Sequence, residues 1–469
     1  MKSYLFHILI FINIIFCEAF DGLTLVTTMG NGQNGSTTTL IDNNENIINS
    51  WVHETGSASI GYLTKDSILF LPSSLNDNGT NGAASGGLFR KIDWHGNTLW
   101  EWELPTDLCI AHHDIEILPN RNILSICRES KTMEETLSAG LVEPDEPLSL
   151  DMIIEIQPLD NNQAEIVWKW HFWDHLIQDR DSTFTSTYGQ ISEHPELLDI
   201  NVNENWRTSD WNHTNMISYN ENLDQIVISS RHMDEIYVID HSTTTEEAAS
   251  HSGGRYGMGG DFLYRWGNPQ NYNRGTEQDR IFGGQHGIHW IPDNYPGAGN
   301  FLVFNNLHQT NPNRSAVLEF ENIADENGYY YIDDQEPFGP STYQWIYLTS
   351  FYAPTQSGAY RLPNGNTLLT VADDAEIYEV TYEGEVVWEY NYPANNSMIA
   401  RAQKYAIDAF DYQPLLGDIN GDEILNVLDV ILVVNMILGS ADIDLNGDMN
   451  NDNGINVLDV VLLVNEILS

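Results

Sequence analysis

The chain has 469 residues, and its 68 acidic side chains outnumber 19 basic ones, giving a formal net charge of −49. This length suffices for one large closed repeat architecture with a small appended domain. The negative charge argues against binding to nucleic acid or to anionic lipid, because both partners require basic patches.

Residues 1–19 predict a secretory signal peptide. An early lysine precedes a long apolar run, and Cys17 and Ala19 supply the small residues expected at −3 and −1 of the cleavage site. A membrane anchor is the alternative, but the run is short for a span. We therefore expect a secreted protein, located in the periplasm, outside the cell or at the cell surface.

Two cysteines, Cys109 and Cys127, remain after the predicted cleavage. Export permits a disulfide between them. Pairing around the turn at 119–122 would leave them several residues out of register, so the sequence leaves their disulfide state open.

A two-part repeat runs through most of the chain. Its first part is a hairpin with Asn, Gly or Pro between alternating apolar residues, as in IEILPNRNIL (115–124) and YRLPNGNTLL (360–369). Its second part joins an apolar strand to a tryptophan-rich strand, as in FRKIDWHGNTLWEWEL (89–104). The pattern predicts an all-β fold, a six-bladed β-propeller over 20–412, with seven blades as the alternative. The segment 401–412 is expected to supply a missing strand and close the ring.

The composition changes abruptly at Gly417, where a duplicated acidic segment begins. DINGDEILNVLD (418–429) and DMNNDNGINVLD (448–459) place Asp, Asn, Asp, Asn and Asp at loop positions 1, 3, 5, 9 and 12, and an apolar helix follows each loop. With a backbone carbonyl at position 7, these side chains form an oxygen cage for Ca²⁺. The expected ligands are Asp418, Asn420, Asp422, Asn426, Asp429, Asp448, Asn450, Asp452, Asn456 and Asp459.

This segment, 417–469, resembles a type I dockerin. The resemblance implies a small α-helical domain that binds calcium and docks to a cohesin-like or cell-surface partner. Glu423 and Asn453 depart from it at loop position 6, where glycine is usual. Because Asn tolerates a left-handed backbone better than Glu, we expect weaker binding in the first loop.

Three histidines share one register of the repeated hairpin. His113, His213 and His286 each lie six residues before the hairpin turn, and Ser357 takes the same place in a fourth repeat. Residues at one register of successive innermost strands form a ring around a propeller axis. We therefore expect the three imidazoles to converge at one channel mouth, with Ser357 completing the ring.

Further polar residues are expected near this ring. His289 lies three residues beyond His286, so it should point to the opposite face of its strand. His171 and His175 begin a long insertion, 173–212, and are expected to cover the mouth. The remaining candidates flank the three histidines in sequence or follow them in the next strand; they are His112, Asp114, Asn215, Arg231, His232, Asn305, His308 and Arg314.

Such a set of side chains has two chemical interpretations. Neutral imidazole acts as nucleophile or base, and guanidinium stabilises anionic oxygens, which suits transfer of an anionic group such as sulfuryl. Alternatively, three imidazoles hold a transition metal with an open coordination position.

Several segments together resemble the bacterial arylsulfotransferases (aryl-sulfate sulfotransferases) over most of 21–412: WKWHFWDHLIQD, ISEHPELLDIN, SDWNHTNMISYN, IVISSRH and QHGIHWIPD. The resemblance implies an exported six-bladed propeller that moves a sulfuryl group from a phenolic sulfate ester to a phenolic acceptor. The transfer passes through a sulfo-histidine and needs neither a nucleotide donor nor a cofactor. Carried over, His213 and His286 match the family's active-site histidines, and Arg314 matches its sulfate-binding arginine.

One position departs from that family. The last repeat reads ADDAEIYEV, so Glu376 stands where the sulfated histidine is expected, and a carboxylate would repel sulfate. We therefore expect His213 or His113 to be the nucleophile, with His286 as a third catalytic residue. The expected substrate-binding residues are Arg314, Asn215, Arg231, Asn305 and His308.

Two other functions remain open at this point. The first is a non-catalytic ligand-binding propeller displayed at the cell surface through its calcium-binding tail, which the Glu376 departure favours. The second is a hydrolase whose histidines hold a metal. Aryl sulfates and phenols are the partners expected of the transferase, and none of these functions involves nucleic acid.

Overall fold

The computed structural model describes residues 18–30, 35–75, 84–202, 210–333, 335–393, 398–411, 415–420, 424–441, 443–450, 452 and 454–468. The chain divides into two compact units, one of residues 1–63 and 68–407 and the other of residues 64–67 and 408–469. The predicted signal peptide lies almost wholly outside the described residues. In the part of the chain that is described, no helix has the length and apolar character needed to cross a membrane.

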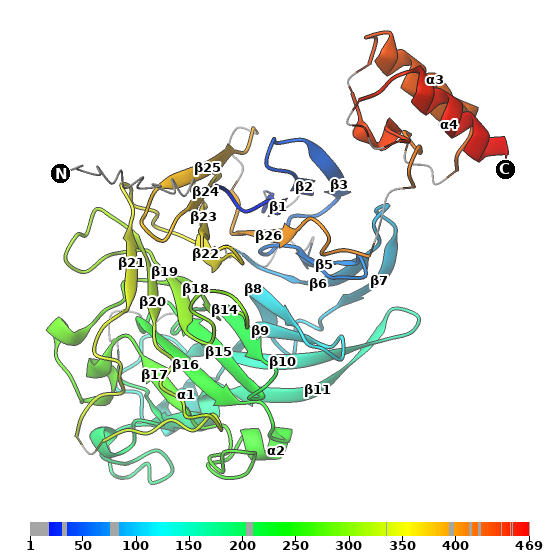
Figure 1. Ribbon diagram of the computed structural model, residues 1–469. Coiled ribbons are helices and arrows are strands. Elements are labelled where there is room, and N and C mark those ends of the chain that lie inside the picture. Colours follow the sequence, from blue (N-terminus) through cyan, green and yellow to red (C-terminus); the bar gives the residue numbers. More distant parts are fainter. Residues whose placement is uncertain are drawn as a thin grey trace, which may run out of the picture. The chain divides into compact units, whose positions relative to one another are not determined.

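The first unit is a six-bladed β-propeller, which confirms the prediction of six blades rather than seven (Figure 1). Each blade is a four-stranded antiparallel sheet, and the first strands β8, β14, β18 and β22 of four successive blades contact one another in turn. Five blades follow chain order. The first contains β4 (Tyr62–Leu63), β5 (Leu69–Ser74), β6 (Gly87–Ile92) and β7 (Thr98–Glu103), and the second contains β8 (Ile110–Ile117), β9 (Ile123–Ser130), β10 (Ser149–Leu159) and β11 (Gln163–His171). The third contains β14 (Thr214–Asn220), β15 (Gln225–Ser230), β16 (Glu235–Asp240) and β17 (Tyr264–Trp266), the fourth contains β18 (His286–Trp290), β19 (Phe301–Asn305), β20 (Ala316–Phe320) and β21 (Trp345–Leu348), and the fifth contains β22 (Gly358–Arg361), β23 (Thr367–Val371), β24 (Glu376–Val380) and β25 (Val386–Asn391).

The sixth blade joins the two ends of the propeller sequence. Strand β26 (Ala402–Ala406) pairs antiparallel with β1 (Gly22–Thr27), and β2 (Ser36–Ile41) and β3 (Ile47–His53) complete the sheet. The strand expected from 401–412 therefore closes the ring as predicted. This closure brings residues from the end of the propeller to its centre.

The tryptophans of the repeat join each blade to the next. The indole N–H of Trp51 in β3 donates to the carbonyl of Asp93 at 2.8 Å, and that of Trp100 in β7 donates to Gln163 at 3.0 Å. Equivalent bonds run from later blades to the following one; their donors are Trp168, Trp266, Trp345 and Trp388. A tryptophan supplies a large apolar body and one polar N–H, so the repeat satisfies both packing and hydrogen bonding at each blade interface.

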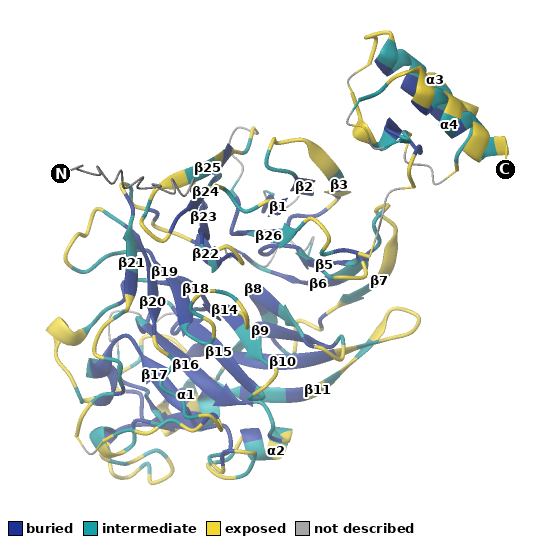
Figure 2. Cartoon of the chain, in the orientation of Figure 1, coloured by how far each residue is buried: buried dark blue, intermediate teal, exposed yellow. Residues whose placement is uncertain are grey.

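Short elements outside the blades come from the connection between β9 and β10, from the insertion 173–212 and from the segments before and after β17. They are α1 (Met133–Ser138), η1 (Phe172–His175), β12 (Leu176–Ile177), η2 (Ile191–Glu193), β13 (Leu198–Asp199), α2 (Thr245–Ala248), η4 (Pro269–Tyr272) and η5 (Glu277–Asp279). Strands β12 and β13 form a small parallel pair. Figure 2 shows that the inner strands of the blades are buried, whereas outer strands such as β3 and β25 and many loops carry exposed residues.

Cys109 and Cys127 are both buried and free in the structure. Burial, together with a hydrogen bond to Cys109, raises the pKa of the Cys127 thiol well above its ordinary value. The two thiols therefore lie next to each other, and that of Cys127 stays protonated at neutral pH.

The second unit contains helices α3 (Val427–Ile437) and α4 (Val457–Leu468), with the single turn η6 (Leu445–Gly447) between them. The helices contact each other, and Val433, Met436 and Leu463 are their buried apolar residues. Asn426 caps the first helix, because its side-chain oxygen accepts from the Leu428 N–H at 2.8 Å.

Candidate functional site

Left-handed backbone conformations mark the start of several innermost strands. His113 and His213 have φ values of 59° and 51°, and Ser357 has a φ of 76°. In β18 the corresponding distortion falls on Gly287, with a φ of 72°, directly after His286. The strand registers shift at the three histidine positions, as in a β-bulge. A left-handed backbone is costly for histidine, and such strain is concentrated at functional sites.

The imidazole of His213 lies at the centre of a histidine cluster. Its ring centroid is 4.7 Å from that of His113 and 4.7 Å from that of His232. Burial, followed by the proximity of His213, His112 and His286, holds the pKa of His113 well below its ordinary value. The three histidines that the sequence singled out therefore share one electrostatic environment.

The bonds around His112 determine the tautomer of His113. The Nε2–H of His112 donates to Asp151 Oδ1 at 3.0 Å, so its Nδ1 carries a lone pair. The Nδ1 atoms of His112 and His113 lie 2.8 Å apart, and the proton between them therefore belongs to His113. Asp151 is itself held by the N–H of Thr214 at 2.5 Å. This assignment leaves an unprotonated Nε2 on His113.

His213 and His286 have the same tautomer for separate reasons. The Nδ1–H of His213 donates to Asp210 Oδ2 at 2.6 Å. The Nδ1–H of His286 donates to Asn306 Oδ1 at 2.8 Å, and the Asn306 amide is oriented by its own bonds to the carbonyls of Ala353 and Gln356. All three rings thus present an Nε2 lone pair to which no described residue is hydrogen-bonded.

Burial keeps the rings of His113, His286 and His232 neutral beside one ionised carboxylate. Burial is the main cause that lowers the pKa of His286 well below its ordinary value, and the charges of Arg231, His213 and Arg401 add to it. Burial and nearby His213 lower the pKa of His232 to about 4. Although burial opposes ionisation of Asp210, its hydrogen bond from His213 and the neighbouring histidines lower its pKa to about 2. At neutral pH the site therefore holds nucleophilic or basic imidazoles and an ionised carboxylate.

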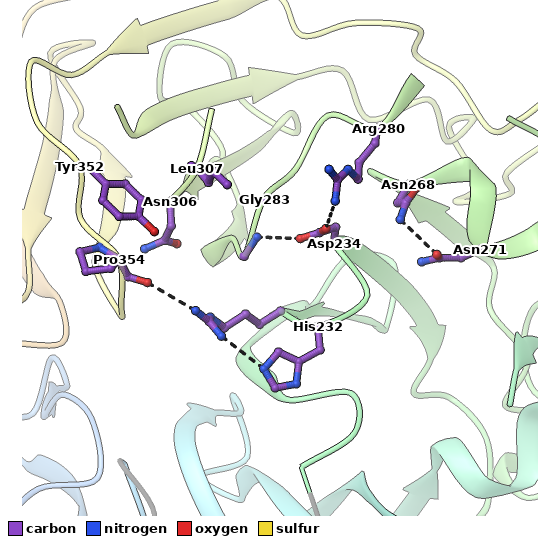
Figure 3. A pocket seen from close by; sticks show the side chains of 12 residues that line it. His232, Asp234, Asn268, Asn271, Arg280, Gly283, Asn306, Leu307, Tyr352 and Pro354 are labelled. Carbon is purple, nitrogen blue, oxygen red and sulfur yellow. Dashed lines mark hydrogen bonds and ion pairs between the residues drawn. The ribbon is translucent and has the colours of Figure 1, made fainter. Parts of the chain in front are cut away.

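A cavity of about 430 Å³ adjoins this cluster, and it is shown in Figure 3. His232 and Asn306 belong to its wall as well as to the histidine cluster. The other lining residues supply arginines, asparagines and an apolar side with one tyrosine; they are Arg231, Asp234, Asn268, Asn271, Arg280, Gly283, Gly284, Leu307, Tyr352 and Pro354.

The two arginines of the cavity differ in their partners. Arg280 forms ion pairs with Asp234 at 3.1 Å and with Glu277 at 2.5 Å. Among the described residues, the guanidinium of Arg231 makes two long bonds, 3.3 Å to His232 Nε2 and 3.5 Å to the carbonyl of Pro354, and it forms no ion pair. Its charge influences Asp234 without a direct contact, so the guanidinium suits an anionic ligand.

Sequence reasoning missed Arg401, which lies beside the cluster. Its guanidinium forms a fully buried ion pair with Asp114 at 2.6 Å, and Asp114 also accepts from the Tyr62 hydroxyl at 2.6 Å. Burial raises the pKa of Asp114, and the Arg401 charge opposes that effect. The network joins the closing blade to the blades of β4 and β8. The sequence offers one signal for Arg401, because a basic residue stands at the start of the closing strand in a chain that has few basic residues.

Other predicted residues have structural partners. Asn215 donates to the carbonyl of Gln285 at 2.7 Å, and Asn305 accepts from the N–H of Gly283 at 2.8 Å. Arg314 donates to the backbone carbonyls of Leu348, at 2.9 Å, and Thr349.

Several of these residues lie away from the histidine cluster. Neither Arg314 nor His308 lines the cavity, and burial is the main cause that lowers the pKa of His308. His289 is buried against Tyr360, with ring centroids 4.8 Å apart. Glu376 accepts a hydrogen bond from the Tyr378 hydroxyl on β24, the third strand of its blade.

The metal interpretation of the three histidines finds little geometric support. Among the described residues, two groups bring three potential ligand atoms within 4.8 Å of one another. One is Asp210, His213 and His232, and the other is a separate group around His175. Neither group contains His113 or His286, so the predicted trio is not arranged around a single ion.

The two acidic loops of the second unit are described in part. Asp418, Asp429, Asp448 and Asp459, the first and last predicted ligands of each loop, are all buried. Asp459 Oδ1 has no hydrogen-bond partner among the described residues. The chain has no basic residue after Lys404. Buried carboxylates are costly unless they are paired or hydrogen-bonded, and carboxylate and amide oxygens are the ligands that Ca²⁺ prefers, so this donor set fits a divalent cation.

The other predicted loop ligands have different surroundings. Asn426 and Asn456 turn their side-chain oxygens to helix N–H groups at 2.8 and 2.9 Å. Asn420 and Asp452 are exposed, and Asn450 is half-buried. Asp422 and the position-6 residues Glu423 and Asn453 lie outside the described residues.

The arylsulfotransferase (ASST) family model matches residues 21–413 of the chain. The chain belongs to the arylsulfotransferase family. The match covers the propeller and its histidine cluster and ends before the acidic loops. The comparison with curated proteins gave no match.

Several solved structures resemble the propeller at low identity. A protein of unknown function from Bacteroides caccae is 13% identical, with a TM-score of 0.43 over 82% of this chain and 99% of that one. The periplasmic gluconolactonase PpgL of Pseudomonas aeruginosa is 11% identical, with a TM-score of 0.43 over 82% and 99%. A catalytically inactive virginiamycin B lyase of Staphylococcus aureus is 11% identical, with a TM-score of 0.35 over 81% and 87%. These values carry no argument about the activity of this arylsulfotransferase family member.

Proposed function

We propose that this protein is an exported aryl-sulfate sulfotransferase that moves a sulfuryl group from a phenolic sulfate ester to a phenolic acceptor. One observation carries the proposal: the rings of His113, His213 and His286 each have Nδ1 engaged in a hydrogen bond and Nε2 left without one, beside a cavity whose Arg231 forms no ion pair with any described carboxylate. Membership of the arylsulfotransferase family supports the same reaction.

The cavity suits an aryl sulfate in both of its parts. Arg231 would bind the sulfate oxygens, since guanidinium pairs well with tetrahedral oxyanions. Tyr352, Leu307 and Pro354 would contact the aryl ring. In this arrangement the sulfur atom lies on the side of the cavity formed by His232, which also belongs to the histidine cluster.

In the first half-reaction, His213 Nε2 attacks the sulfur. The N–S bond forms as the bond between sulfur and the aryl oxygen breaks, and the phenolate leaves with the electron pair. The ring then carries a positive charge, which the Asp210 carboxylate compensates through its 2.6 Å bond to Nδ1–H.

In the second half-reaction, an acceptor phenol loses its proton to His113 Nε2 and attacks the sulfur. The N–S bond breaks, and its electron pair returns to His213. The imidazolium formed on His113 is stabilised through His112, whose Nε2–H is held by Asp151. His213 thus acts as the nucleophile and His113 as the base.

Accessibility distinguishes His213 from His113 as the nucleophile. The side chain of His213 is 19% exposed, and its Nδ1 has a carboxylate partner. His113 is 4% exposed, and its Nδ1 has a neutral imidazole partner. A nucleophile must reach the sulfur and tolerate a positive charge, so His213 fits this role better.

Turnover of 4-nitrophenyl sulfate tests the function. Without acceptor the transferase releases at most one equivalent of nitrophenol; continued release requires an added phenol, and an equal amount of the acceptor's sulfate ester appears. His213→Asn should abolish the release. Nitrophenol release of many equivalents without acceptor would instead indicate a hydrolase, and saturable binding without turnover would indicate the ligand-binding propeller.

We also propose that residues 417–469 bind two Ca²⁺ ions and attach the propeller to a cohesin-like or cell-surface partner. The four buried aspartates, the unpartnered Asp459 Oδ1 and the absence of basic residues after Lys404 support the calcium part. Export through the predicted signal peptide belongs to the same proposal. Calcium would order the loops of this unit, and the propeller residues carry out the sulfuryl transfer without it.

A further inference from the structure

A second group of histidines lies outside the proposed active site. His175 ends η1 in the long insertion, and His251 and Asp261 lie in the loop between α2 and β17. The ligand atoms of these three residues lie within 4.8 Å of one another. The sequence led us to expect that His175 covers the channel mouth, whereas in the structure it belongs to this second group.

The two ring nitrogens of His175 face different partners. Its Nε2 lies 2.9 Å from the carbonyl oxygen of Ala248, which can only accept, so the ring carries a proton on Nε2. Its Nδ1 lies 2.7 Å from Asp261 Oδ1. In a neutral ring these two atoms are both acceptors and would repel each other, unless a proton or a metal ion lies between them.

His251 approaches the same oxygen from the solvent side. Its Nδ1 is 2.8 Å from Asp261 Oδ1, and its side chain is 60% exposed. By contrast, His175 is fully buried and Asp261 is 7% exposed. The carboxylate oxygen is therefore shared by two imidazole nitrogens, one rigid and one free to adjust.

The surrounding backbone is shaped to hold His175 in place. A Cβ on Gly260 would lie 2.0 Å from Ala248 O and 2.6 Å from His175 Nε2, so only glycine fits there. The Trp170 indole donates to the carbonyl of Gly260 at 2.7 Å and stacks on the His175 ring, with centroids 5.5 Å apart. A backbone carbonyl that accepts from the far nitrogen is the usual means of orienting a metal-binding histidine.

The open side of the group faces a cavity of about 480 Å³. His251 and Asp261 line it, together with His194 and Glu196. Two imidazoles and one carboxylate, with a position open to a cavity, form the ligand set of many zinc sites. The net charge of −49 also favours cation uptake.

We propose that His175 Nδ1, His251 Nδ1 and Asp261 bind a divalent transition metal of the Zn²⁺ type, which ties the insertion to the loop before β17. Tetrahedral coordination at bond lengths of 2.0–2.1 Å separates ligand atoms by about 3.3 Å. The His175–Asp261 and His251–Asp261 distances, 2.7 and 2.8 Å, would therefore each lengthen by about half an ångström, through movement of the exposed His251 and of the Asp261 carboxylate. The remaining coordination position faces the cavity and takes water or a small anion.

Co²⁺ titration of the full chain tests this site. The protein is stripped with a chelator, saturated with Ca²⁺ to fill the acidic loops, and titrated with Co²⁺, followed by competition with Zn²⁺. We expect one equivalent to give the intense visible absorption of four-coordinate Co²⁺, and Zn²⁺ to remove that absorption. Zn²⁺ should also raise the temperature of propeller unfolding.

Matched variants locate the ion. His251→Ala changes an exposed side chain and should weaken Co²⁺ binding on the order of 100-fold, because one of three ligands is lost. His213→Ala removes a ligand from the other group, that of Asp210 and His232, and should leave the absorption unchanged. Absence of the absorption in the unmodified chain would mean that a proton joins His175 to Asp261, and it would overturn the proposal. So would loss of the absorption in His213→Ala with retention in His251→Ala.

Discussion

His112 and His113, adjacent in the sequence, turn toward each other so that their Nδ1 atoms lie 2.8 Å apart. In a regular strand, consecutive side chains point to opposite faces of the sheet. The left-handed backbone of His113, with its φ of 59°, breaks this alternation. The strain therefore places a second imidazole, with its carboxylate partner Asp151, behind the proposed base.

Replacing His112 should slow the second half-reaction alone. In His112→Phe, the imidazolium of His113 loses its stabilising partner, and we expect steady-state turnover to fall about 10- to 100-fold. The initial burst of nitrophenol should keep its rate, and more acidic acceptor phenols, which need less help to lose their proton, should recover much of the activity. Stopped-flow kinetics with a series of phenols measures both effects. The control is His289→Phe, which alters a buried histidine outside the cluster; an equal loss of burst and turnover in His112→Phe would contradict the assigned role.

Arg231 should determine the affinity for the sulfate ester. Removing a charge-assisted contact to an anion costs about 1.5–3 kcal/mol, so Arg231→Gln should raise KM for 4-nitrophenyl sulfate at least about tenfold. The KM of the phenol acceptor should change little, because the acceptor is uncharged. Arg255→Gln is a suitable control, since the Arg255 guanidinium lies on the surface, where it donates to the carbonyls of Asn222 and Leu223 and lies over the Tyr256 ring, and it does not line the cavity. An unchanged KM in Arg231→Gln would place the sulfate elsewhere.

A buried ion cluster makes stability depend on pH. His241 bonds to Asp224 at 2.8 Å and Glu155 at 3.1 Å, joining the blades of β10 and β14. Although burial opposes protonation, these two carboxylates raise the pKa of His241 to about 9. Because the folded pKa lies above the ordinary 6.5, the stabilisation is complete below pH 6.5 and is lost as pH rises through 9.

His241→Gln should therefore destabilise the propeller most at low pH. We expect the free energy of unfolding to fall by about 2 kcal/mol at pH 6, with the difference from the unmodified chain shrinking toward pH 10. Urea unfolding at several pH values measures this effect. His95→Gln, in an exposed turn, is the control. A difference that stays constant from pH 6 to pH 10 would show that His241 is not charged in the folded chain.

Calcium binding should depend on the last aspartate of each loop. Asp459→Asn removes a buried carboxylate whose Oδ1 has no described protein partner, so we expect one of two Ca²⁺ sites to weaken by about tenfold or more. Isothermal titration of the full chain counts both sites. Asp444→Asn, outside the two loops, should leave both affinities intact. A chain that takes up no Ca²⁺, or an Asp459→Asn variant that binds normally, would contradict the calcium proposal.

The fold was accessible from sequence because the propeller repeats its local chemistry. Each hairpin carries its own Asn, Pro or Gly turn, and Trp51 and Trp100 exemplify a tryptophan that recurs at each blade interface. The closing strand could be predicted because the N-terminal repeat is incomplete by itself. His113 and His213 could be predicted to lie together because they share the same spacing from the hairpin turn, and both have a left-handed backbone at the start of their innermost strands. His286 differs by one position, since the left-handed residue of its strand is Gly287.

The partners of these histidines were not accessible in the same way. Asp151 and Asn306 act through contacts formed only when blades and loops distant in sequence come together. Arg401 reaches the centre because the last strand closes the first blade. Arg314 was selected through the family resemblance, and the structure places its guanidinium on backbone carbonyls. No local pattern reports such long-range contacts.

Trapping the covalent intermediate tests the central claim most directly. The enzyme is mixed with 4-nitrophenyl sulfate without acceptor, digested at alkaline pH and mapped by mass spectrometry. We predict one SO₃ group on the peptide that contains His213, its disappearance when phenol is added, and its absence in His213→Asn. An SO₃ group on His113 instead, or stoichiometric nitrophenol release with no modified histidine, would contradict the proposed mechanism.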